Sequence, residues 1–275
     1  MEELTLKEIH HGTLKIMDRI DEICNQLEIN YFLMFGSLIG AIRHNGFIPW
    51  DDDLDIMMIR DDYEKLLKYF RDNKMNLYPL KLFSSEMENY PYMISRISDI
   101  DYKLIVENEE SFGIGLFVDV YPIDGVGNSM REVKCIAKKV KYLASLCYLS
   151  TRQKCIKDNT KSIIRLILKY PSFLFSKVRG KKYFKNRINE YIGKHKYEEC
   201  QYVGCTSWLV DMEKEVFPKE WVESTTYASF EAHKFKIPEH YHEILTQIYG
   251  DYMKLPPENE RIAHHYYKAY KKEQS

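Results

Sequence analysis

Apolar side chains recur along the first 28 residues at the spacing of one face of an α-helix. Thr5 and Glu8 stand three residues apart at the start of this stretch, as in a capping box. The pattern therefore predicts one amphipathic helix with its apolar face on a core. The residues of that face are Leu6, Ile9, Thr13, Ile16, Met17, Ile20, Ile23, Cys24 and Leu27.

Shorter apolar runs follow, and they alternate between the periods of strands and helices. Up to residue 121 we expect strands at 31–35, 51–59, 92–98, 103–106 and 115–121 and helices at 38–44 and 61–70. Gly36-Ser37 is expected to end the first strand, and Pro122 the last. The order predicts an α/β (α+β) fold with a mixed sheet and flanking helices.

The second half of the chain begins with a helical and basic stretch from 129 to about 196, with breaks at Pro171 and Gly180. A strand near 227–237 and a helix near 239–249 follow. We divide the chain into a catalytic core with its N-terminal helix at 1–128, a basic helical insertion at 129–199 and a mixed C-terminal region at 200–275 that completes the active site.

Composition excludes several classes of protein. The 275 residues are 45% hydrophobic and 29% charged, which is ordinary for a soluble globular protein. The six cysteines include no Cys-x-x-Cys pair, so reduced thiols are expected rather than a zinc ribbon or a disulfide scaffold. The sequence shows neither a secretory signal nor a membrane-spanning stretch, and we expect a cytoplasmic protein.

The net charge of −1 hides a strongly basic segment. Between Arg131 and Arg187 there are 17 Lys and Arg against two acids, Glu132 and Asp158, a formal charge of +15. Such a block indicates an anionic partner, such as nucleic acid, anionic lipid or a phosphate polymer. It is equally typical of a solvated basic face on surface helices, and both interpretations remain open.

Four aspartates fall within five residues, at Asp51, Asp52, Asp53 and Asp55. Like charges at this density repel one another unless solvent or a cation screens them. Alternate residues of a strand share a face, so Asp53 and Asp55 would point the same way with Cα atoms about 7 Å apart. Paired carboxylates on a rigid strand suit Mg²⁺.

Two other interpretations of this acidic run are weaker. An EF-hand loop needs Gly at its sixth position and Glu at its twelfth, where this chain has Ile56 and Asp62. A merely exposed acidic loop would not place acids in alternation with the apolar residues of a strand. Metal binding is therefore favoured.

A third acid, Asp119, lies inside the apolar strand at 115–121. Burying a lone ionised carboxylate is costly, so we expect it to be paired or metal-bound beside Asp53 and Asp55. Asp124 follows Pro122 and is expected in a loop or at a helix cap. Gly36-Ser37 ends a strand, and Ser37 is placed to cap the next helix beside a phosphate group.

Gly-Ser, an Asp-x-Asp strand and a later acid together resemble the nucleotidyltransferase superfamily. The segment GSLIGAIRHNGFIPWDDDLDI (36–56) more narrowly resembles the LicD family of phosphocholine and polyol-phosphate transferases. FEAHKFKIPEHYHEIL (230–245) and YGDYMKLPPENERIAHH (249–265) are similar to further family signatures, although Ala232 stands where relatives usually have glycine. The resemblance covers both ends of the chain and little of 130–200.

The resemblance implies a nucleotidyltransferase-like fold and transfer of a phospho-alcohol from a CDP-activated donor, CDP-choline foremost, to a sugar hydroxyl, with release of CMP. Asp53, Asp55 and Asp119 would be catalytic and hold Mg²⁺, with Mn²⁺ as a substitute, and Asp119 is also our candidate for the general base. Gly36 and Ser37 would contact phosphate, and Asp51 would contact either a metal ligand or the substrate.

Further substrate contacts are assigned by residue type. Arg43, Arg261 and His264 are expected to bind phosphate, the last two from one face of a helix if that segment is helical. Arg96 is a weaker candidate, for which a surface salt bridge is favoured. Trp50 adjoins the acids, and Tyr249, Tyr252, Tyr266 and Tyr267 cluster near the last signature, where aromatic faces suit the quaternary ammonium of choline.

The expected acceptor is a glycan precursor of teichoic acid or lipopolysaccharide. Such acceptors are often lipid-linked, so 131–187 is expected to contact anionic lipid at the inner face of the membrane. The alternative enzyme is a nucleotidyltransferase that uses an NTP. A nucleic-acid-binding module would explain the basic segment, but RNA-recognition and zinc-finger signatures are missing, and no nucleic acid is expected as partner.

Overall fold

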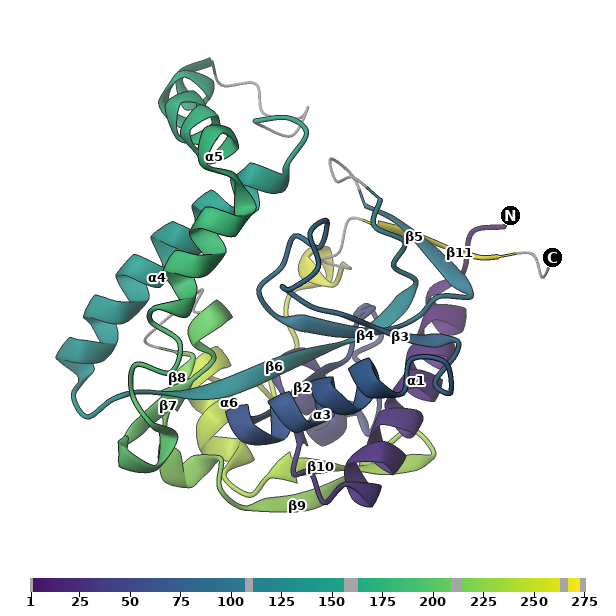
Figure 1. Cartoon of the computed structure of the whole chain (residues 1–275). Coiled ribbons are helices and arrows are strands. Elements are labelled where there is room, and N and C mark those ends of the chain that lie inside the picture. Colours follow the sequence, from purple (N-terminus) through teal and green to yellow (C-terminus); the bar gives the residue numbers. More distant parts are fainter. Residues whose placement is uncertain (1, 107–110, 156–162, 209–213, 263–266, 273–275) are drawn as a thin grey trace.

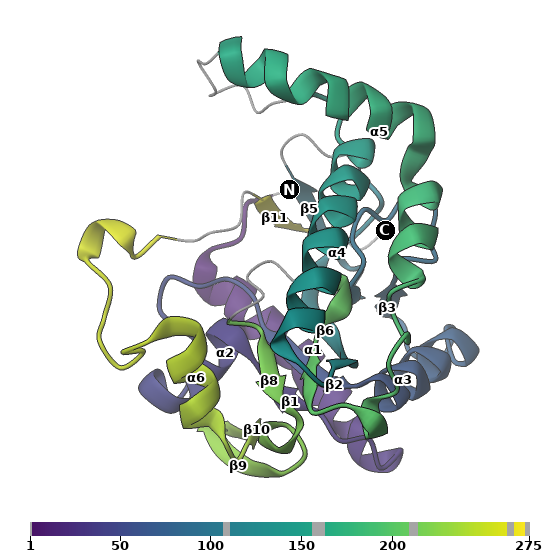
Figure 2. The same cartoon turned by 90° about the vertical axis from the view of Figure 1, so that its left-hand side faces the viewer.

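Figure 1 shows the computed structural model of the chain, which describes residues 2–106, 111–155, 163–208, 214–262 and 267–272. A twisted mixed sheet forms its centre, helices pack on the sheet, and a helical arm projects away from it (Figures 1 and 2). The α/β (α+β) class with a helical insertion is confirmed.

Five strands form the central sheet in the order β1-β2-β6-β4-β3, and two further strands extend it, since β7 pairs with β6 and β8 with β7. Only β2 and β6 run parallel among these described pairs. The bounds are β1 Phe32–Leu33, β2 Asp55–Ile59, β3 Leu80–Phe83, β4 Ser95–Asp99, β6 Leu116–Gly127, β7 Tyr202–Gly204 and β8 Val216–Pro218.

Two antiparallel pairs lie outside this sheet: β9 Thr225–Phe230 with β10 His233–Pro238, and β5 Tyr102–Val106 with β11 Tyr267–Lys271. The helices are α1 Leu6–Gln26, α2 Phe35–Ile39 with a π-helical continuation Gly40–His44, α3 Arg60–Asp72, α4 Met130–Thr151, α5 Ile163–Asn189 and α6 Tyr241–Tyr249. Short 3₁₀ turns occupy Tyr197–Glu199, Thr206–Trp208, Lys219–Trp221 and Glu258–Glu260.

The N-terminal helix α1 forms as its sequence predicts. Thr5 accepts from the Glu8 amide, and the Glu8 carboxylate accepts from the Thr5 amide at 2.8 Å, so the capping box is confirmed. Its apolar face is buried in the main core, which also contains Phe217 and Ile244 from the C-terminal region. The beginning and the end of the chain therefore share one core around the sheet.

The prediction that Pro122 ends its strand is wrong. The Asp119 amide donates to the carbonyl of Leu54, just before β2, at 2.9 Å, so alternation turns the nitrogens of residues 120 and 122 toward β4. The pairing with β4 ends at Val120, opposite Ser95. Pro122 therefore lies beyond the end of β4, where no partner needs its missing N–H, and β6 continues to Gly127.

Several predicted boundaries also differ. The strand at 31–35 shrinks to Phe32–Leu33, and α2 begins at Phe35, so Gly36 and Ser37 lie inside a helix rather than in a turn before it. The acidic strand begins only at Asp55. The stretch near 227–237 is the β9–β10 hairpin, and Pro171 does not interrupt α5, whereas Gly180 does, at φ 71°.

The basic helices have a core of their own. Ile136 and Val140 of α4 pack with Phe184 and Ile188 of α5, and Met93 connects this cluster to the sheet. All six cysteines are free thiols, as expected.

Candidate active site

Three neighbouring strands place an arginine and two aspartates in one row. Asp55 of β2 pairs in register with Asp119 of β6, and Asp119 pairs with Arg96 of β4. The Arg96 Nε donates to Asp119 Oδ1 at 2.6 Å and Nη2 to Oδ2 at 3.3 Å. The sheet register therefore builds a buried ion pair directly beside Asp55.

Asp53, Asp55 and Asp119 come together as the sequence predicts. Their carboxylates each offer an oxygen within 4.8 Å of the other two, which is close enough for one cation. The position of Asp53 differs from the prediction, because Asp53 lies in the loop before β2 rather than on the strand. The neighbouring acids Asp51 and Asp52 form a second such group with Asp53.

Asp55 is the most telling member of this group. Its carboxylate is buried, and Oδ1 has no hydrogen-bond partner among the residues that the structure describes. Burial is the largest cause that raises the pKa of Asp55 well above the ordinary carboxyl range, and the charges of Asp53 and Asp119 add to it. A buried oxygen without a donor, facing two other acids, fits a divalent cation such as Mg²⁺.

The acidic loop, which we define as residues 51–54 before β2, is held by hydrogen bonds from three elements. His10 of α1 hydrogen-bonds the Asp51 carbonyl at 2.6 Å, and Tyr267 of β11 donates to the Asp52 carbonyl at 3.0 Å. The Ser37 hydroxyl accepts from the Asp55 amide at 2.8 Å. Since these contacts fix the backbone on both sides of Asp53, the carboxylates are positioned before any ligand binds.

Gly36 and Ser37 contact the aspartates of this site in different ways. The Asp51 carboxylate lies where a side chain at Gly36 would begin, with Oδ2 only 2.5 Å from that Cβ position. The N-cap of α2 is Met34, without a side-chain hydrogen bond, so the prediction that Ser37 caps a helix is wrong. Ser37 instead positions Asp55.

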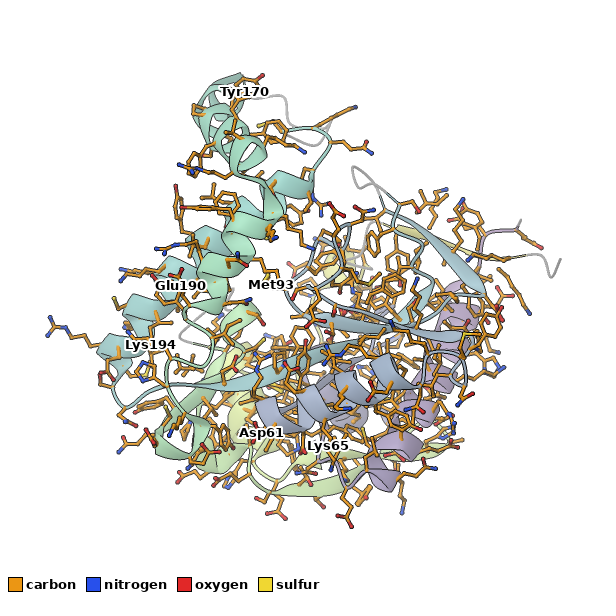
Figure 3. The ribbon with its side chains drawn as sticks, in the orientation of Figure 1. Asp61, Lys65, Met93, Tyr170, Glu190 and Lys194 are labelled. Atoms are coloured by element: carbon orange, nitrogen blue, oxygen red, sulfur yellow. The ribbon has the colours of Figure 1, made fainter. Side chains whose placement is uncertain are left out.

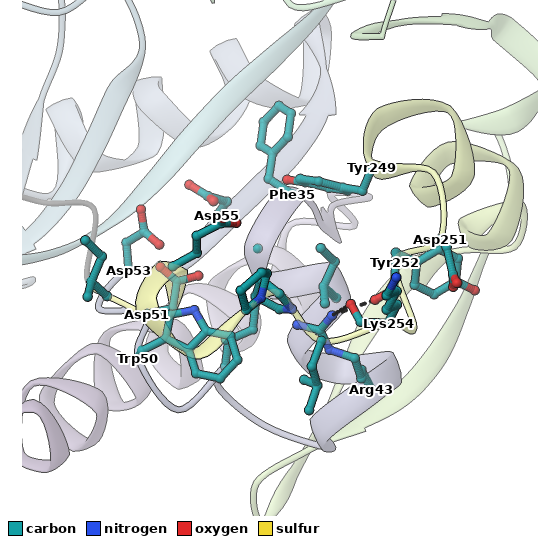
Figure 4. A pocket seen from close by; sticks show the side chains of 18 of the residues that line it. Phe35, Arg43, Trp50, Asp51, Asp53, Asp55, Tyr249, Asp251, Tyr252 and Lys254 are labelled. Carbon is teal, nitrogen blue, oxygen red and sulfur yellow. Dashed lines mark hydrogen bonds between the residues drawn. The ribbon is translucent and has the colours of Figure 1, made fainter.

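Asp51, Asp53 and Asp55, but not Asp119, line a cleft of about 810 Å³ that β2, β6, α2, α6 and the segment after α6 surround (Figure 4). The predicted residues Gly36, Arg43, Trp50, Asp51, Asp53 and Asp55 line it, as do Tyr249 and Tyr252. Its other lining residues are Phe35, Ile39, Ile48, Tyr121, Glu215, Asp251, Lys254, Leu255, Pro256, Pro257, Asn259, Glu260 and Ile262.

The predicted cationic residues are distributed around this cleft. Arg43, in the π-helical continuation of α2, donates to the Tyr252 carbonyl at 2.6 Å and connects this helix to the turn after α6 (Figure 4). The Arg261 guanidinium lies over the Trp50 ring, 5.7 Å from its centroid. Arg261 follows a 3₁₀ turn rather than a helix, and His264 and Tyr266 lie outside the described residues.

Two predictions about charged residues are corrected. Asp124 lies within β6, where Arg60 holds it with two hydrogen bonds of 2.8 Å, rather than in a loop or at a cap. Arg96 does form a salt bridge, but a buried one, with Asp119. Its guanidinium carbon lies 3.9 Å from the ring centroid of Phe117 and 4.3 Å from that of Tyr92. An arginine within the apolar stretch YMISRIS was the signal that could have indicated this.

Sequence reasoning missed the cleft residues Phe35, Tyr121 and Glu215. Phe35 has φ 51°, a conformation uncommon for a bulky side chain, and its ring meets Tyr121 edge-on with centroids 5.2 Å apart. Such a backbone outlier beside a carboxylate cluster is itself typical of a functional site. No periodicity in the sequence indicates it.

Comparison with known proteins adds the family. Residues 28–153 match the family described as LicD/FKTN/FKRP, nucleotidyltransferase domain. The lipopolysaccharide cholinephosphotransferase LicD of Haemophilus influenzae is 33% identical over 272 residues, which cover 98% of this chain and 99% of that protein. This chain belongs to the LicD family. An uncharacterized protein of Rickettsia typhi is 30% identical over 113 residues, covering 40% of this chain and 33% of its own length.

LicD family membership makes the protein a transferase. The matched domain contains the Gly36-Ser37 helix start, the acidic loop and Asp119, whereas Tyr249 and the segment after it lie beyond residue 153. The full-length similarity to the Haemophilus protein includes those C-terminal residues, which complete the cleft.

Proposed function

We propose that this protein transfers phosphocholine from CDP-choline to a sugar hydroxyl of a cell-surface glycan precursor, of the lipopolysaccharide or teichoic acid type, and releases CMP. The observation that carries the proposal is the group formed by Asp53, Asp55 and Asp119, of which Asp53 and Asp55 line a cleft large enough for a nucleoside diphosphate. The name of the full-length Haemophilus relative supports the choice of phosphocholine and of a glycan.

The three carboxylates supply the donor set for Mg²⁺, and Mn²⁺ prefers the same oxygen ligands. The unpartnered Oδ1 of Asp55 supports this assignment, since a buried carboxylate oxygen otherwise finds a hydrogen-bond donor. Such an ion would neutralise the charge of the donor diphosphate and stabilise the departing phosphate oxygen.

Aromatic side chains beside the acids support choline as the carried alcohol. Phe35 and Tyr249 line the same cleft as Asp55 (Figure 4), and the Phe35 ring contacts Tyr121. Aromatic faces attract a quaternary ammonium group, and the carboxyl group of Glu215 also lines this cleft. An uncharged polyol would gain neither contribution.

The proposed reaction is an in-line displacement at the phosphorus that carries choline. The acceptor hydroxyl oxygen forms the new bond, the bond from phosphorus to the oxygen shared with CMP breaks, and CMP leaves with that oxygen. A carboxylate of the cluster, for which we propose Asp119, accepts the hydroxyl proton. Arg96 orients Asp119, and its positive charge limits the repulsion among the three acids.

A thermal-shift panel with Mg²⁺ tests the donor. The protein is heated with CDP-choline, CDP-ethanolamine, CDP-glycerol, CDP-ribitol, CTP or ATP, because a ligand that binds only the folded chain raises the midpoint. We expect the largest rise with CDP-choline and none in Asp53→Asn. The matched control Asp61→Asn, an exposed acid at the start of α3, should respond like the wild type.

The other outcomes decide between functions. Stabilisation by CTP or ATP alone would contradict the proposal and favour an NTP-dependent nucleotidyltransferase. Selective stabilisation by CDP-glycerol or CDP-ribitol would keep the reaction type and overturn the choline assignment. A response unchanged in Asp53→Asn would overturn the metal site.

A further inference from the structure

The first half of α5 exposes large apolar side chains to solvent. Within residues 169–179, which we call the arm tip, four such residues have exposed fractions between 43% and 84%. They are Tyr170 at 48%, Leu174 at 46%, Phe175 at 43% and Val178 at 84%. Of the described side chains in this segment only Ser176 is buried. A helix in a globular core shows the opposite arrangement.

The exposed apolar residues share one face of the arm tip. At about 100° per residue, Tyr170, Leu174 and Val178 follow one another along the helix, and Pro171 and Phe175 extend the face to an arc of roughly 140°. Ser172 and Ser176 lie on the opposite side, where Ser176 is buried. Ser176 thus faces the protein, whereas the five residues of the apolar face are exposed to solvent.

Positive charge borders the apolar face. Residues 159–189 contain nine Lys and Arg and no Asp or Glu. Lys169 and Arg179 stand at the two ends of the arm tip and are both exposed, and Lys182 follows just beyond the Gly180 break. Lys177 donates to the Ser150 carbonyl at 3.0 Å, which fixes the tip to the end of α4.

The arm holds this face away from the catalytic sheet. The second half of α5 packs against α4 through Phe184 and Ile188, whereas the first half bends away at Gly180 and crosses the top of the molecule (Figures 1 and 2). Figure 3 shows Tyr170 at the extremity of this projection. With respect to the described residues, the apolar face is therefore open to a flat surface.

We propose that the arm tip docks the protein on an anionic lipid bilayer, with Tyr170, Leu174, Phe175 and Val178 in the interface and the flanking cations at the headgroups. None of the described helices is long and apolar enough to cross a membrane, so the contact is peripheral. An amphipathic helix of this composition lies in the plane of the interface. A soluble polyanion would satisfy the cations but would leave the apolar face in water.

Vesicle co-sedimentation of the full-length protein tests this docking in the absence of any donor or acceptor. We expect binding to phosphatidylcholine vesicles that contain phosphatidylglycerol, and weaker binding to pure phosphatidylcholine or at high salt. Leu174→Ser/Val178→Ser removes apolar contact, and Lys169→Gln/Lys182→Gln removes charge. Each double variant should lower the coefficient for partition of the protein onto anionic vesicles about tenfold or more.

The matched control is Met75→Ser/Lys74→Gln. It makes the same two chemical changes at exposed positions of the loop after α3, where Met75 is 91% exposed, and should leave vesicle binding unchanged. Asp53→Asn should also bind vesicles normally, so failure of the proposed catalytic function and failure of this inference are distinguishable. Unchanged circular dichroism and thermal midpoints verify that each variant is folded.

Three results would overturn the inference. The first is no binding to anionic vesicles. The second is binding that Lys169→Gln/Lys182→Gln lowers but Leu174→Ser/Val178→Ser does not, which would indicate a soluble polyanion as partner. The third is a wild-type dimer in sedimentation that Leu174→Ser/Val178→Ser converts to a monomer, which would assign the face to a second copy of the chain.

Discussion

At the scale of single residues, Asp55 combines burial with the negative charges of Asp53 and Asp119. Each of these effects opposes ionisation of Asp55, and the positive charge of Arg96 partly offsets them. We therefore expect this cluster to lower the stability of the ligand-free protein, a pattern common where function and folding compete.

We therefore expect Asp55→Asn to abolish transfer and yet to raise the thermal midpoint in EDTA at pH 8. An amide of nearly the same shape removes the buried charge, and each kcal/mol gained shifts the midpoint by about 2–4 °C in a chain of this size. Differential scanning calorimetry measures the shift. Asp61→Asn is the control, and a lower midpoint for Asp55→Asn than for this control would contradict the repulsion argument.

Substitutions in the Arg96–Asp119 ion pair are expected to lower stability rather than raise it. Arg96→Met leaves the Asp119 charge buried without its partner and should lower the free energy of unfolding by about 3–5 kcal/mol. Arg96→Met/Asp119→Leu removes both charges and should recover most of that loss while remaining inactive. Urea denaturation followed by circular dichroism measures both, and equal destabilisation of the two variants would show that packing, not charge, is responsible.

At the scale of elements, two lysines fasten the arm to the sheet region. Lys181 donates to the Met87 carbonyl and Lys185 to the Ser85 carbonyl, each at 2.8 Å. Burial lowers the pKa of Lys181 from 10.5 to about 8, and the nearby Lys185 charge acts in the same direction. The lower part of α5 is thus held by an amine whose charge is poorly solvated.

This pKa shift predicts a pH dependence of stability. Between pH 8 and 10.5 the unfolded chain keeps a proton on Lys181 that the folded chain has lost, so this group makes folding more favourable as pH rises through that window. We expect the stability of the wild type relative to Lys181→Met to increase from pH 7.5 to pH 9.5. Urea unfolding at both values measures it.

The exposed Lys182 supplies the control for that measurement. Lys182→Met should show no such pH-dependent difference from the wild type, because the Lys182 side chain is exposed. A Lys181→Met difference that is independent of pH would show that the lysine acts only through its hydrogen bond to Met87.

Elements were predictable from sequence where local signals agreed. The capping box and the apolar stripe of α1, and the break at Gly180, depend only on neighbouring residues. The continuation of β6 through Pro122 depends on where β4 ends, and the early start of α2 depends on a Phe35 backbone conformation that the fold imposes. Such features are set by tertiary contacts, which periodicity does not encode.

At the scale of the whole molecule, the two ends of the chain meet at the active site. β11 pairs with β5, and the Leu4 amide donates to the Ala269 carbonyl at 2.8 Å. From this position Tyr267 reaches the acidic loop. The sequence predicted the acids Asp53, Asp55 and Asp119 from their chemistry, but their support by His10 and Tyr267 arises only when distant segments pack together.

The contact between β11 and the acidic loop can be tested by removing one hydrogen bond. Tyr267→Phe keeps the ring but removes the hydrogen bond to the Asp52 carbonyl, worth about 1 kcal/mol in stability. Since that bond orients the loop that carries Asp53, we expect transfer activity to fall about tenfold, because small displacements of positioned groups are costly in catalysis. Tyr270→Phe, on the same strand, is the matched control and should leave activity unchanged. CMP release with CDP-choline, together with the thermal midpoint, separates a local loss of positioning from general unfolding. If both variants lost activity equally, the strand as a whole, and not its hydrogen bond to the loop, would be what the site requires.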